Sequence, residues 1–304
     1  MTLDSAGTAA RTSGLIVVEA ERGVLLVAGS DRVTWLNGVV TADVATVAPG
    51  TATFGLLLSK VGKIQSDFYV LARGDTLALA VAEGTDTHVQ AELERMLVME
   101  DAEIRSATSE LACLVVHGPK AAELASAVAT LEGVTTAALD RTGLGGAVLL
   151  VPRPRLDEVA ARLVAAGGVL ATPEAWQRLR VERRVGTFGI DYGSSDNPHE
   201  AALDRVAVSW TKGCYLGQEV VFMQDARGKL KRRLVQLELE GASPPPGTPL
   251  TDAAGAPLGE VTSAAESALL GHPVALARVK APHHEPGVRL AVAGVPAVVR
   301  AEPV

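Results

Sequence analysis

The segment Gly241-Ala242-Ser243-Pro244-Pro245-Pro246-Gly247 constrains the fold of this chain most strongly. Consecutive prolines lack the N–H donors that a helix or a central strand needs, and the flanking glycines favour turns. No regular element is therefore expected to cross this segment. Beyond it, short apolar runs alternate with Gly and Pro turns at residues 259–262, 268–270, 274–280, 288–292 and 298–301.

Residues 234–240, just before the Pro-rich segment, alternate apolar and polar side chains as a half-buried strand does. Together with the short runs that follow, they predict a small antiparallel barrel. We therefore expect a C-terminal β-barrel over residues 231–304.

The remainder, residues 1–230, is predicted to be an α+β region of two similar halves. A strand that reaches a glycine before a helix occurs at 26–31 and again at 114–120. A strand followed by a helix occurs at 77–99 and again at 147–166. If this weak repeat is real, two halves pack together, side by side or interleaved, and share a crevice; chance resemblance of two strand–helix units is the alternative.

Two shorter features complete the prediction for this region. Residues 1–14 are small and polar, which predicts a loose tail. Thr172 and Pro173 are typical of a helix start, because Thr caps the first turn and Pro has no N–H to leave unpaired.

Composition excludes several classes of protein. The chain has 304 residues, is 48% hydrophobic and carries a net charge of −7, which indicates a folded globular protein. The negative charge argues against a surface that binds nucleic acid throughout. No apolar run reaches the roughly 20 residues that cross a bilayer, and no secretory signal is recognised, so a cytoplasmic protein without membrane contact is expected. The two cysteines do not make a disulfide framework, and Cys113, in the apolar run 111–116, is expected in a buried strand.

Unusual residue chemistry gathers in the octapeptide Lys212-Gly213-Cys214-Tyr215-Leu216-Gly217-Gln218-Glu219. A nearby cation favours thiolate over thiol, so Lys212 is a candidate activator of Cys214. Gly213 and Gly217 allow backbone conformations that other residues avoid. A glycine-bounded turn with a buried, inert cysteine is an equally good interpretation from the residues alone.

Other candidate sites are weaker. His283-His284 lies in a Pro-rich turn without Cys or acid at ligand spacing, so no metal site is predicted. The basic run 229–233 could bind an anionic ligand tail or RNA, and a solvated strand edge is favoured over RNA. Glu182 could hold a heterocycle by accepting two N–H donors, although composition alone favours a salt-bridged glutamate.

The octapeptide, followed by Arg227-Gly228 and Arg232-Arg233-Leu234, resembles the signature of the YgfZ family of folate-binding proteins. That family is related to the T-protein (aminomethyltransferase) of the glycine cleavage system. Residues 35–43 and 60–64 are similar to the N-terminal part of the family, and residues 197–201 to its acidic loop. The resemblance therefore covers most of the chain.

The resemblance implies a cloverleaf of three subdomains around a folate site, with two ferredoxin-like halves within 1–230 and the barrel over 231–304. It implies tetrahydrofolate or a one-carbon derivative as ligand. It also implies a role with iron–sulfur enzymes or assembly proteins in cluster assembly or repair, with an indirect effect on tRNA modification. Cys214 would be the functional thiol, within a signature that includes Gly213, Tyr215, Gly217, Gln218 and Glu219.

The resemblance also suggests roles for residues outside the octapeptide. Glu182 lies nine residues before Asp191, the spacing of the folate-holding glutamate of the T-protein. Glu182 would therefore hold the pteridine, in a crevice lined by Asn37, Asp67 and Trp210, with Arg227 near the anionic tail. Ser66 stands where the T-protein has one of two adjacent acids, which leaves aminomethyl transfer as a rival function. A tRNA-binding module is a second rival, and whether catalysis occurs stays open.

Overall fold

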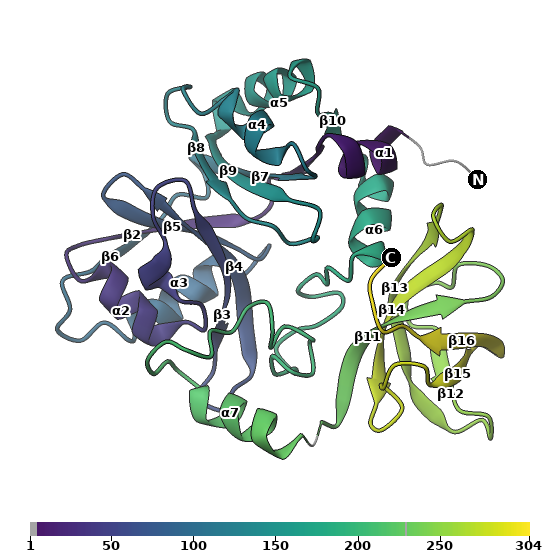
Figure 1. The fold of residues 1–304 in the computed structure, drawn as a ribbon. Helices are drawn as coiled ribbons and strands as arrows, with labels where there is room; N and C mark the ends of the chain where they lie inside the picture. The colour runs from purple at the N-terminus through teal and green to yellow at the C-terminus, as the bar shows by residue number, and fades with distance from the viewer. Residues whose placement is uncertain (1–4, 229) are drawn as a thin grey trace.

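The computed structural model describes residues 5–228 and 230–304. Three units surround a common centre: two sheet units with helices, and a barrel (Figure 1). The predicted α+β class and C-terminal antiparallel barrel are confirmed.

The first unit is a five-stranded sheet in the order β3-β4-β5-β2-β6. Alternate residues of β4 face opposite sides, so Phe68 and Val70 pack in the cluster that includes the helix residues Leu36 and Val89, while Tyr69 and Leu71 face the middle of the molecule. Its elements are β2 (Gly23–Ala28), α2 (Arg32–Val39), η1 (Val44–Thr46), β3 (Ala52–Leu58), β4 (Ile64–Arg73), β5 (Thr76–Val81), α3 (Asp86–Glu94) and β6 (Glu103–Ser106).

The second unit is a five-stranded sheet in the order β10-β1-β7-β9-β8. Its first strand comes from the N-terminal end of the chain and pairs antiparallel with β7, Leu15 opposite His117. The chain then crosses to the first sheet, where it forms β2. The elements are β1 (Leu15–Glu19), β7 (Leu111–His117), α4 (Ala121–Ser126), β8 (Thr135–Ala138), β9 (Gly146–Pro152), η2 (Arg153–Arg155), α5 (Leu156–Ala165) and β10 (Val169–Leu170).

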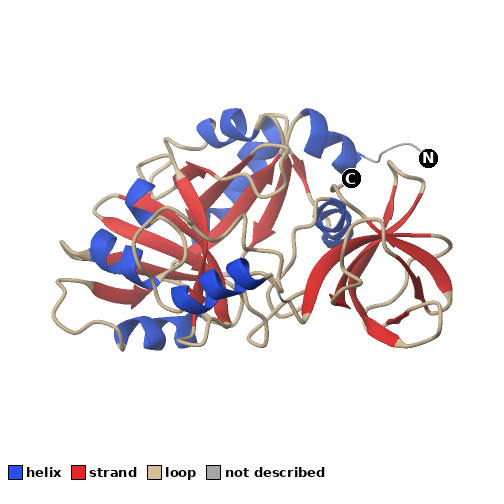
Figure 2. Cartoon of the chain, turned by 60° about the horizontal axis from the view of Figure 1, so that its bottom comes forward, coloured by secondary structure: helices blue, strands red, loops and turns tan. Residues whose placement is uncertain are grey.

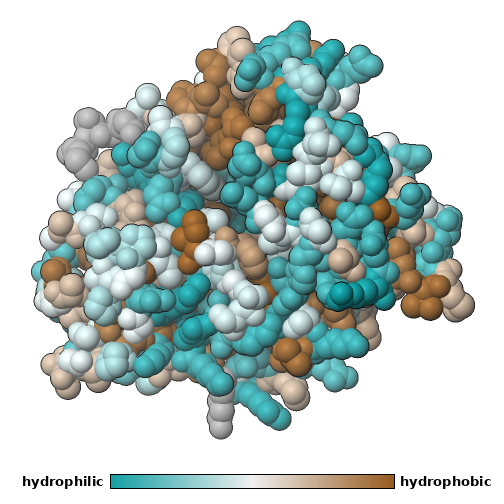
Figure 3. Space-filling model, turned by 180° about the vertical axis from the view of Figure 1, so that it is seen from behind, coloured by the Kyte–Doolittle hydropathy of each residue, from teal (hydrophilic) through white to brown (hydrophobic). Residues whose placement is uncertain are grey.

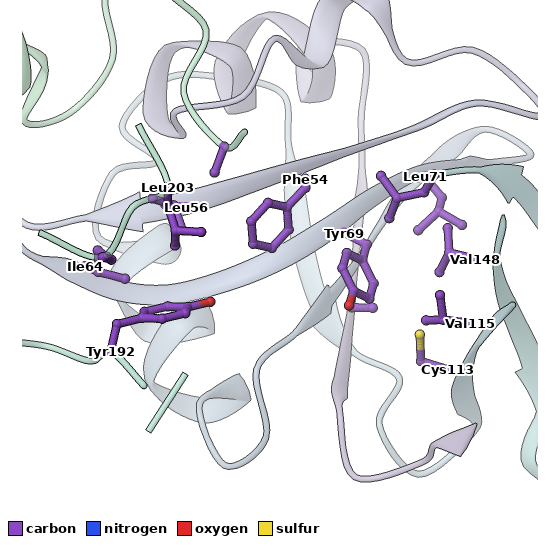
Figure 4. Close-up of a cluster of buried hydrophobic side chains, with 14 of the residues drawn as sticks. Phe54, Leu56, Ile64, Tyr69, Leu71, Cys113, Val115, Val148, Tyr192 and Leu203 are labelled. Atoms are coloured by element: carbon purple, nitrogen blue, oxygen red, sulfur yellow. The ribbon is translucent and has the colours of Figure 1, made fainter. Parts of the chain in front are cut away.

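A core of apolar side chains fills the space between the two sheets. Phe54, Tyr69 and Leu71 come from the first sheet, and Cys113 and Val148 from the second (Figure 4). Cys113 is fully buried in β7, which confirms its predicted place.

Helix α6 (Pro173–Glu182) lies between the second sheet unit and the barrel (Figure 1). The predicted cap is confirmed, because the Thr172 hydroxyl accepts the N–H of Ala175 at 3.2 Å. The predicted loose tail is wrong: Ser5–Thr12 form α1, whose Ala6 and Ala10 pack with Leu179 of α6. Small alanines make this apolar face hard to recognise in the sequence.

The barrel is closed in the order β11-β14-β13-β12-β15-β16. Residues 268–270, predicted as a strand, instead form the turn between β13 and β14, where the N–H of Gly271 donates to Ser267. Helix α7 (Gln218–Arg227) leads into the barrel. The barrel strands are β11 (Arg232–Leu239), β12 (Pro249–Thr251), β13 (Pro257–Ser267), β14 (His272–Lys280), β15 (Arg289–Val292) and β16 (Val295–Val299).

The surface seen from behind is mostly hydrophilic, with a hydrophobic area near its top (Figure 3). Within the described ranges, none of the helices is both long and apolar enough to cross a bilayer.

Candidate functional site

Two motifs that are far apart in the sequence form one structural unit around the cysteine loop, residues 209–217. The N–H of Ser209 donates to the carbonyl of Thr41 at 2.9 Å. The Thr41 hydroxyl donates to the carbonyl of Ala207 at 2.6 Å. The segment after α2 therefore packs against the cysteine loop and holds it in place. Cys214 is exposed on that loop as a free thiol.

The Lys212 ammonium points toward the backbone at the end of α2 and just after it. It donates to the carbonyls of Asn37 at 2.6 Å, Ala42 at 2.7 Å and Val40. Burial lowers the pKa of Lys212 to about 8. The ammonium therefore binds one carbonyl of α2 and two that follow it, and activation of Cys214 by Lys212 stays a prediction.

The glycine that ends the cysteine loop permits a close approach. Gly217 has φ 79°, and a Cβ there would lie 2.7 Å from the carbonyl oxygen of Ser59. The β3–β4 hairpin therefore packs against the start of α7, which comes to the front in Figure 2. Around it, Tyr215 is buried, the Gln218 amide donates to Gly213 at 3.5 Å, and Glu219 is exposed.

Trp210, Asn37 and Arg227 take structural or surface positions. The Trp210 indole donates to the carbonyl of Asp204 at 2.8 Å, and its ring lies 5.0 Å from that of Phe222 on α7. The Asn37 side chain accepts the N–H of Val44 at 2.8 Å. Arg227 is exposed at the last position of α7.

Asp67 lies in the core between the sheets. Its carboxylate accepts hydrogen bonds from the Arg22 guanidinium at 2.9 Å and from the Tyr192 hydroxyl at 2.5 Å. Ser66 faces the other side of β4, where its hydroxyl bonds that of Thr85 at 2.7 Å. Of the two positions weighed in the sequence, Asp67 is therefore the one that faces the middle of the molecule.

Glu182 is only 1% exposed, and its carboxylate already has two donors. The Arg11 guanidinium donates to one oxygen at 2.9 Å, and the Ser267 hydroxyl to the other at 2.8 Å. Glu182 thus forms the salt bridge that composition favoured, with a side chain of α1, and its contact with a pteridine stays a prediction.

A cavity of about 970 Å³ lies where the three units meet, a volume suited to a small organic ligand. The described residues that line it include Leu230 and Arg233 of the predicted basic run. They do not include Cys214, Lys212, Glu182, Asp67, Asn37, Trp210 or Arg227. This cavity therefore does not bring the predicted site residues together, and their shared crevice stays a prediction. The lining comes from β3, the segment before β9, the residues after α6, the barrel strands β11 and β14, and residues 299–303.

The cavity is basic although the chain is acidic overall. Its described lining includes five arginines, Arg141, Arg183, Arg184, Arg233 and Arg300, against Asp140 and Glu285. The Asp140 carboxylate is occupied by the N–H groups of Thr142, Gly143 and Gly145. A concave site of one charge sign concentrates ligands of the opposite charge. This cavity therefore suits an anionic ligand.

Arg141 and Phe54 form a flat surface in the cavity wall. The guanidinium carbon of Arg141 lies 3.3 Å from the centre of the Phe54 ring. Across the described residues, Arg141 has no hydrogen-bond or ion-pair partner, so its donors are free for a ligand. No local pattern in the sequence indicates this residue, because its position in the cavity depends on how the three units pack.

No group of three or more His, Cys, Asp or Glu residues suited to a metal ion occurs within residues 5–228 and 230–304. In the predicted basic run, Arg232 pairs with Asp196 at 2.6 Å and Arg233 with Asp204 at 3.0 Å. Lys229 lies outside the described residues.

Two family models match this chain. The GCVT N-terminal domain matches residues 8–153, and the glycine cleavage T-protein C-terminal barrel domain matches residues 232–304. The mitochondrial aminomethyltransferase of Gallus gallus is 29% identical over 304 residues, covering 87% of this chain and 74% of the relative. The aminomethyltransferase of Saccharopolyspora erythraea is 26% identical over 309 residues, covering 93% of this chain and 83% of the relative.

A solved structure has the same fold. The glycine cleavage system aminomethyltransferase T from Bartonella henselae superposes with a TM-score of 0.83 at 19% identity, covering 97% of this chain and 87% of that chain. At this identity, the likeness establishes the fold alone.

Proposed function

Because this chain carries the N-terminal and C-terminal barrel domains of the glycine cleavage T-protein family, we propose that it binds tetrahydrofolate and takes part in one-carbon transfer. The observation that carries this proposal is the basic cavity where the three units meet. Folates combine a planar ring with an anionic tail. The Arg141–Phe54 surface suits the ring, and the arginines of the opposite wall suit the tail.

Aminomethyl transfer to tetrahydrofolate is the activity that the relatives favour, since those cited above are named aminomethyltransferases. The test is glycine-cleavage turnover with the other purified components and tetrahydrofolate. Turnover that depends on this protein would support transferase activity. Binding of tetrahydrofolate without any turnover would leave folate binding standing and remove the transferase activity.

A second candidate is support of iron–sulfur enzymes by a folate-binding protein of the YgfZ type. The exposed thiol of Cys214, on the octapeptide that resembles the YgfZ signature, favours it. In a strain lacking the protein, the wild-type chain should restore the activity of iron–sulfur enzymes, and Cys214→Ser should not. Full restoration by Cys214→Ser would remove this role.

Glu182 and Asp67 have a conditional place in this proposal. Both carboxylates are buried and already accept two protein hydrogen bonds, from Arg11 and Ser267 at Glu182 and from Arg22 and Tyr192 at Asp67, so a pteridine would share or replace these partners. Arg141 has no hydrogen-bond or ion-pair partner among the described residues and is therefore proposed as the first ligand contact.

A further inference from the structure

Arg184, directly after α6, has an unusual backbone conformation. Its φ is 56°, in the left-handed region. The N–H of Val185 donates to Arg180 at 2.7 Å and the N–H of Arg184 to Val181 at 3.3 Å. This pair of bonds is the Schellman ending of a helix, whose left-handed position is usually glycine because a Cβ crowds the backbone there. An arginine at this position is strained.

The side chain of Arg184 lines the cavity and has an unused donor. Its Nη2 donates to the carbonyl of Arg300 at 2.6 Å, while its Nε is buried without a hydrogen-bond partner. In the part of the chain that the structure describes, Arg184 has no carboxylate partner. The Nε is enclosed by protein, so the donor that a ligand in the cavity can reach is Nη1, which is not buried and has no hydrogen-bond partner among the described residues.

The other basic residues on this side of the cavity are occupied. Arg233 pairs with Asp204 at 3.0 Å, and Arg300 with Glu238. Arg183 donates to the carbonyls of Thr142 at 2.6 Å and Val304 at 2.5 Å. Arg184 is therefore the guanidinium of this group that has capacity for an anion.

We propose that Arg184 binds an anionic group of the cavity ligand, a carboxylate or a phosphate, and that its strained conformation aims the guanidinium at that group. This inference extends the proposed function. It rests on that function in one respect, because the anionic group would be a carboxylate of the folate tail. Strain in the backbone is characteristic of residues that serve binding rather than stability.

The test compares variants that separate charge from backbone strain. Arg184→Gly removes both the cation and the strain, and Arg184→Gln removes the cation alone. Ala202→Gly is the matched control, because Ala202 also lines the cavity with a positive φ, 57°, but carries no charge. Calorimetric titration with tetrahydrofolate should show roughly tenfold to hundredfold weaker binding for both Arg184 variants, the range of a lost hydrogen bond to a charged group. Ala202→Gly should bind as the wild type does.

Two further probes identify the group that is bound. Tetrahydropterin has the ring but no carboxylates, so it should bind wild type and Arg184→Gly equally. Inorganic phosphate should raise the melting temperature of the wild type and not that of Arg184→Gly. Arg184→Gly should also melt about 1–3 °C above the wild type in the absence of ligand, because the strain is relieved.

The outcomes separate the two proposals. Equal tetrahydrofolate affinity of wild type and both Arg184 variants would overturn the role of Arg184. Equal weakening of tetrahydrofolate and tetrahydropterin would overturn the assignment to an anionic group. Failure of the wild type to bind tetrahydrofolate would overturn the proposed function, and the phosphate result would then decide the anion site by itself.

Discussion

The cavity and the cysteine loop both present basic side chains, but those side chains differ in what they touch. Lys212 gives its ammonium to three backbone carbonyls, whereas Arg141 and Arg184 of the cavity keep donors unused. A charge with protein partners holds the fold together. A charge with unused donors is available to a ligand. We therefore expect Lys212 to contribute to stability and the two arginines to bind the ligand, and we expect Asp67, which has two protein partners, to resemble Lys212.

The largest effect is expected at Asp67. Asp67→Ala leaves the Tyr192 hydroxyl without its acceptor and removes one of the two carboxylates that pair with Arg22. The free energy of unfolding should therefore fall by about 3–5 kcal/mol. Chemical denaturation measures it, with the exposed Asp75→Ala as control. A loss below about 1 kcal/mol would break the comparison, because unpairing a buried charge normally costs far more.

Lys212→Met should have the next largest effect. It leaves three carbonyls without their donor, which should lower the free energy of unfolding by about 2–3 kcal/mol. Lys60→Met, at an exposed hairpin position, is the control. The rate of Cys214 alkylation at neutral pH sharpens the result. An equal rate in Lys212→Met and wild type would support the carbonyl contact, and a clearly slower rate in Lys212→Met would support the activating role that the sequence suggested.

The buried histidine of β7 gives a prediction in pH. Burial lowers the pKa of His117 to about 3, so the folded protein keeps it neutral while the unfolded chain takes up a proton below its ordinary pKa near 6.5. This contribution to stability is present above pH 6.5 and is lost as the pH falls toward 3. Between pH 6.5 and 5, wild type should lose about 1.6 kcal/mol relative to His117→Phe. The exposed His88→Gln should follow the wild type, and parallel curves for wild type and His117→Phe would contradict the assignment.

The smallest effect on stability is expected at Cys214. The thiol is exposed, so Cys214→Ser should change the free energy of unfolding by less than about 0.5 kcal/mol and leave tetrahydrofolate affinity unchanged. Differential scanning calorimetry and a binding titration measure the two quantities. Weaker tetrahydrofolate binding in Cys214→Ser would show that the cysteine loop also contributes to ligand binding, and would contradict the separation of the two regions.

The sequence predicted those features that depend on local pattern. The Gly and Pro turns predicted the barrel, and the Thr172-Pro173 start predicted the cap of α6. The apolar run around Cys113 predicted that this side chain is buried. Contacts across long separations could not be predicted this way. Lys212 meets carbonyls 170 to 175 residues earlier, and no local signal shows which way its ammonium points.

Of the cavity arginines, Arg233 lies in the basic run that the sequence singled out, whereas Arg141 and Arg184 could not be predicted. Arg184 lies two residues after Glu182 in the sequence, but only the backbone shows its left-handed φ of 56°. Arg141 meets Phe54 through the packing of one sheet unit on the other. The cysteine loop could be recognised in the sequence because its unusual residues are consecutive in the octapeptide. The cavity residues come from separate segments of all three units, so no single stretch of sequence indicates them.

The most direct test of this account is a calorimetric titration of tetrahydrofolate into wild type, Arg141→Gln and Arg95→Gln. Arg95 is the control, a cation whose side chain is 71% exposed on the first sheet unit, away from the cavity lining. The account predicts saturable binding to wild type and Arg95→Gln, with at least about tenfold weaker binding to Arg141→Gln. No binding to the wild type, or equal binding to all three proteins, would contradict the claim that folate occupies the central cavity.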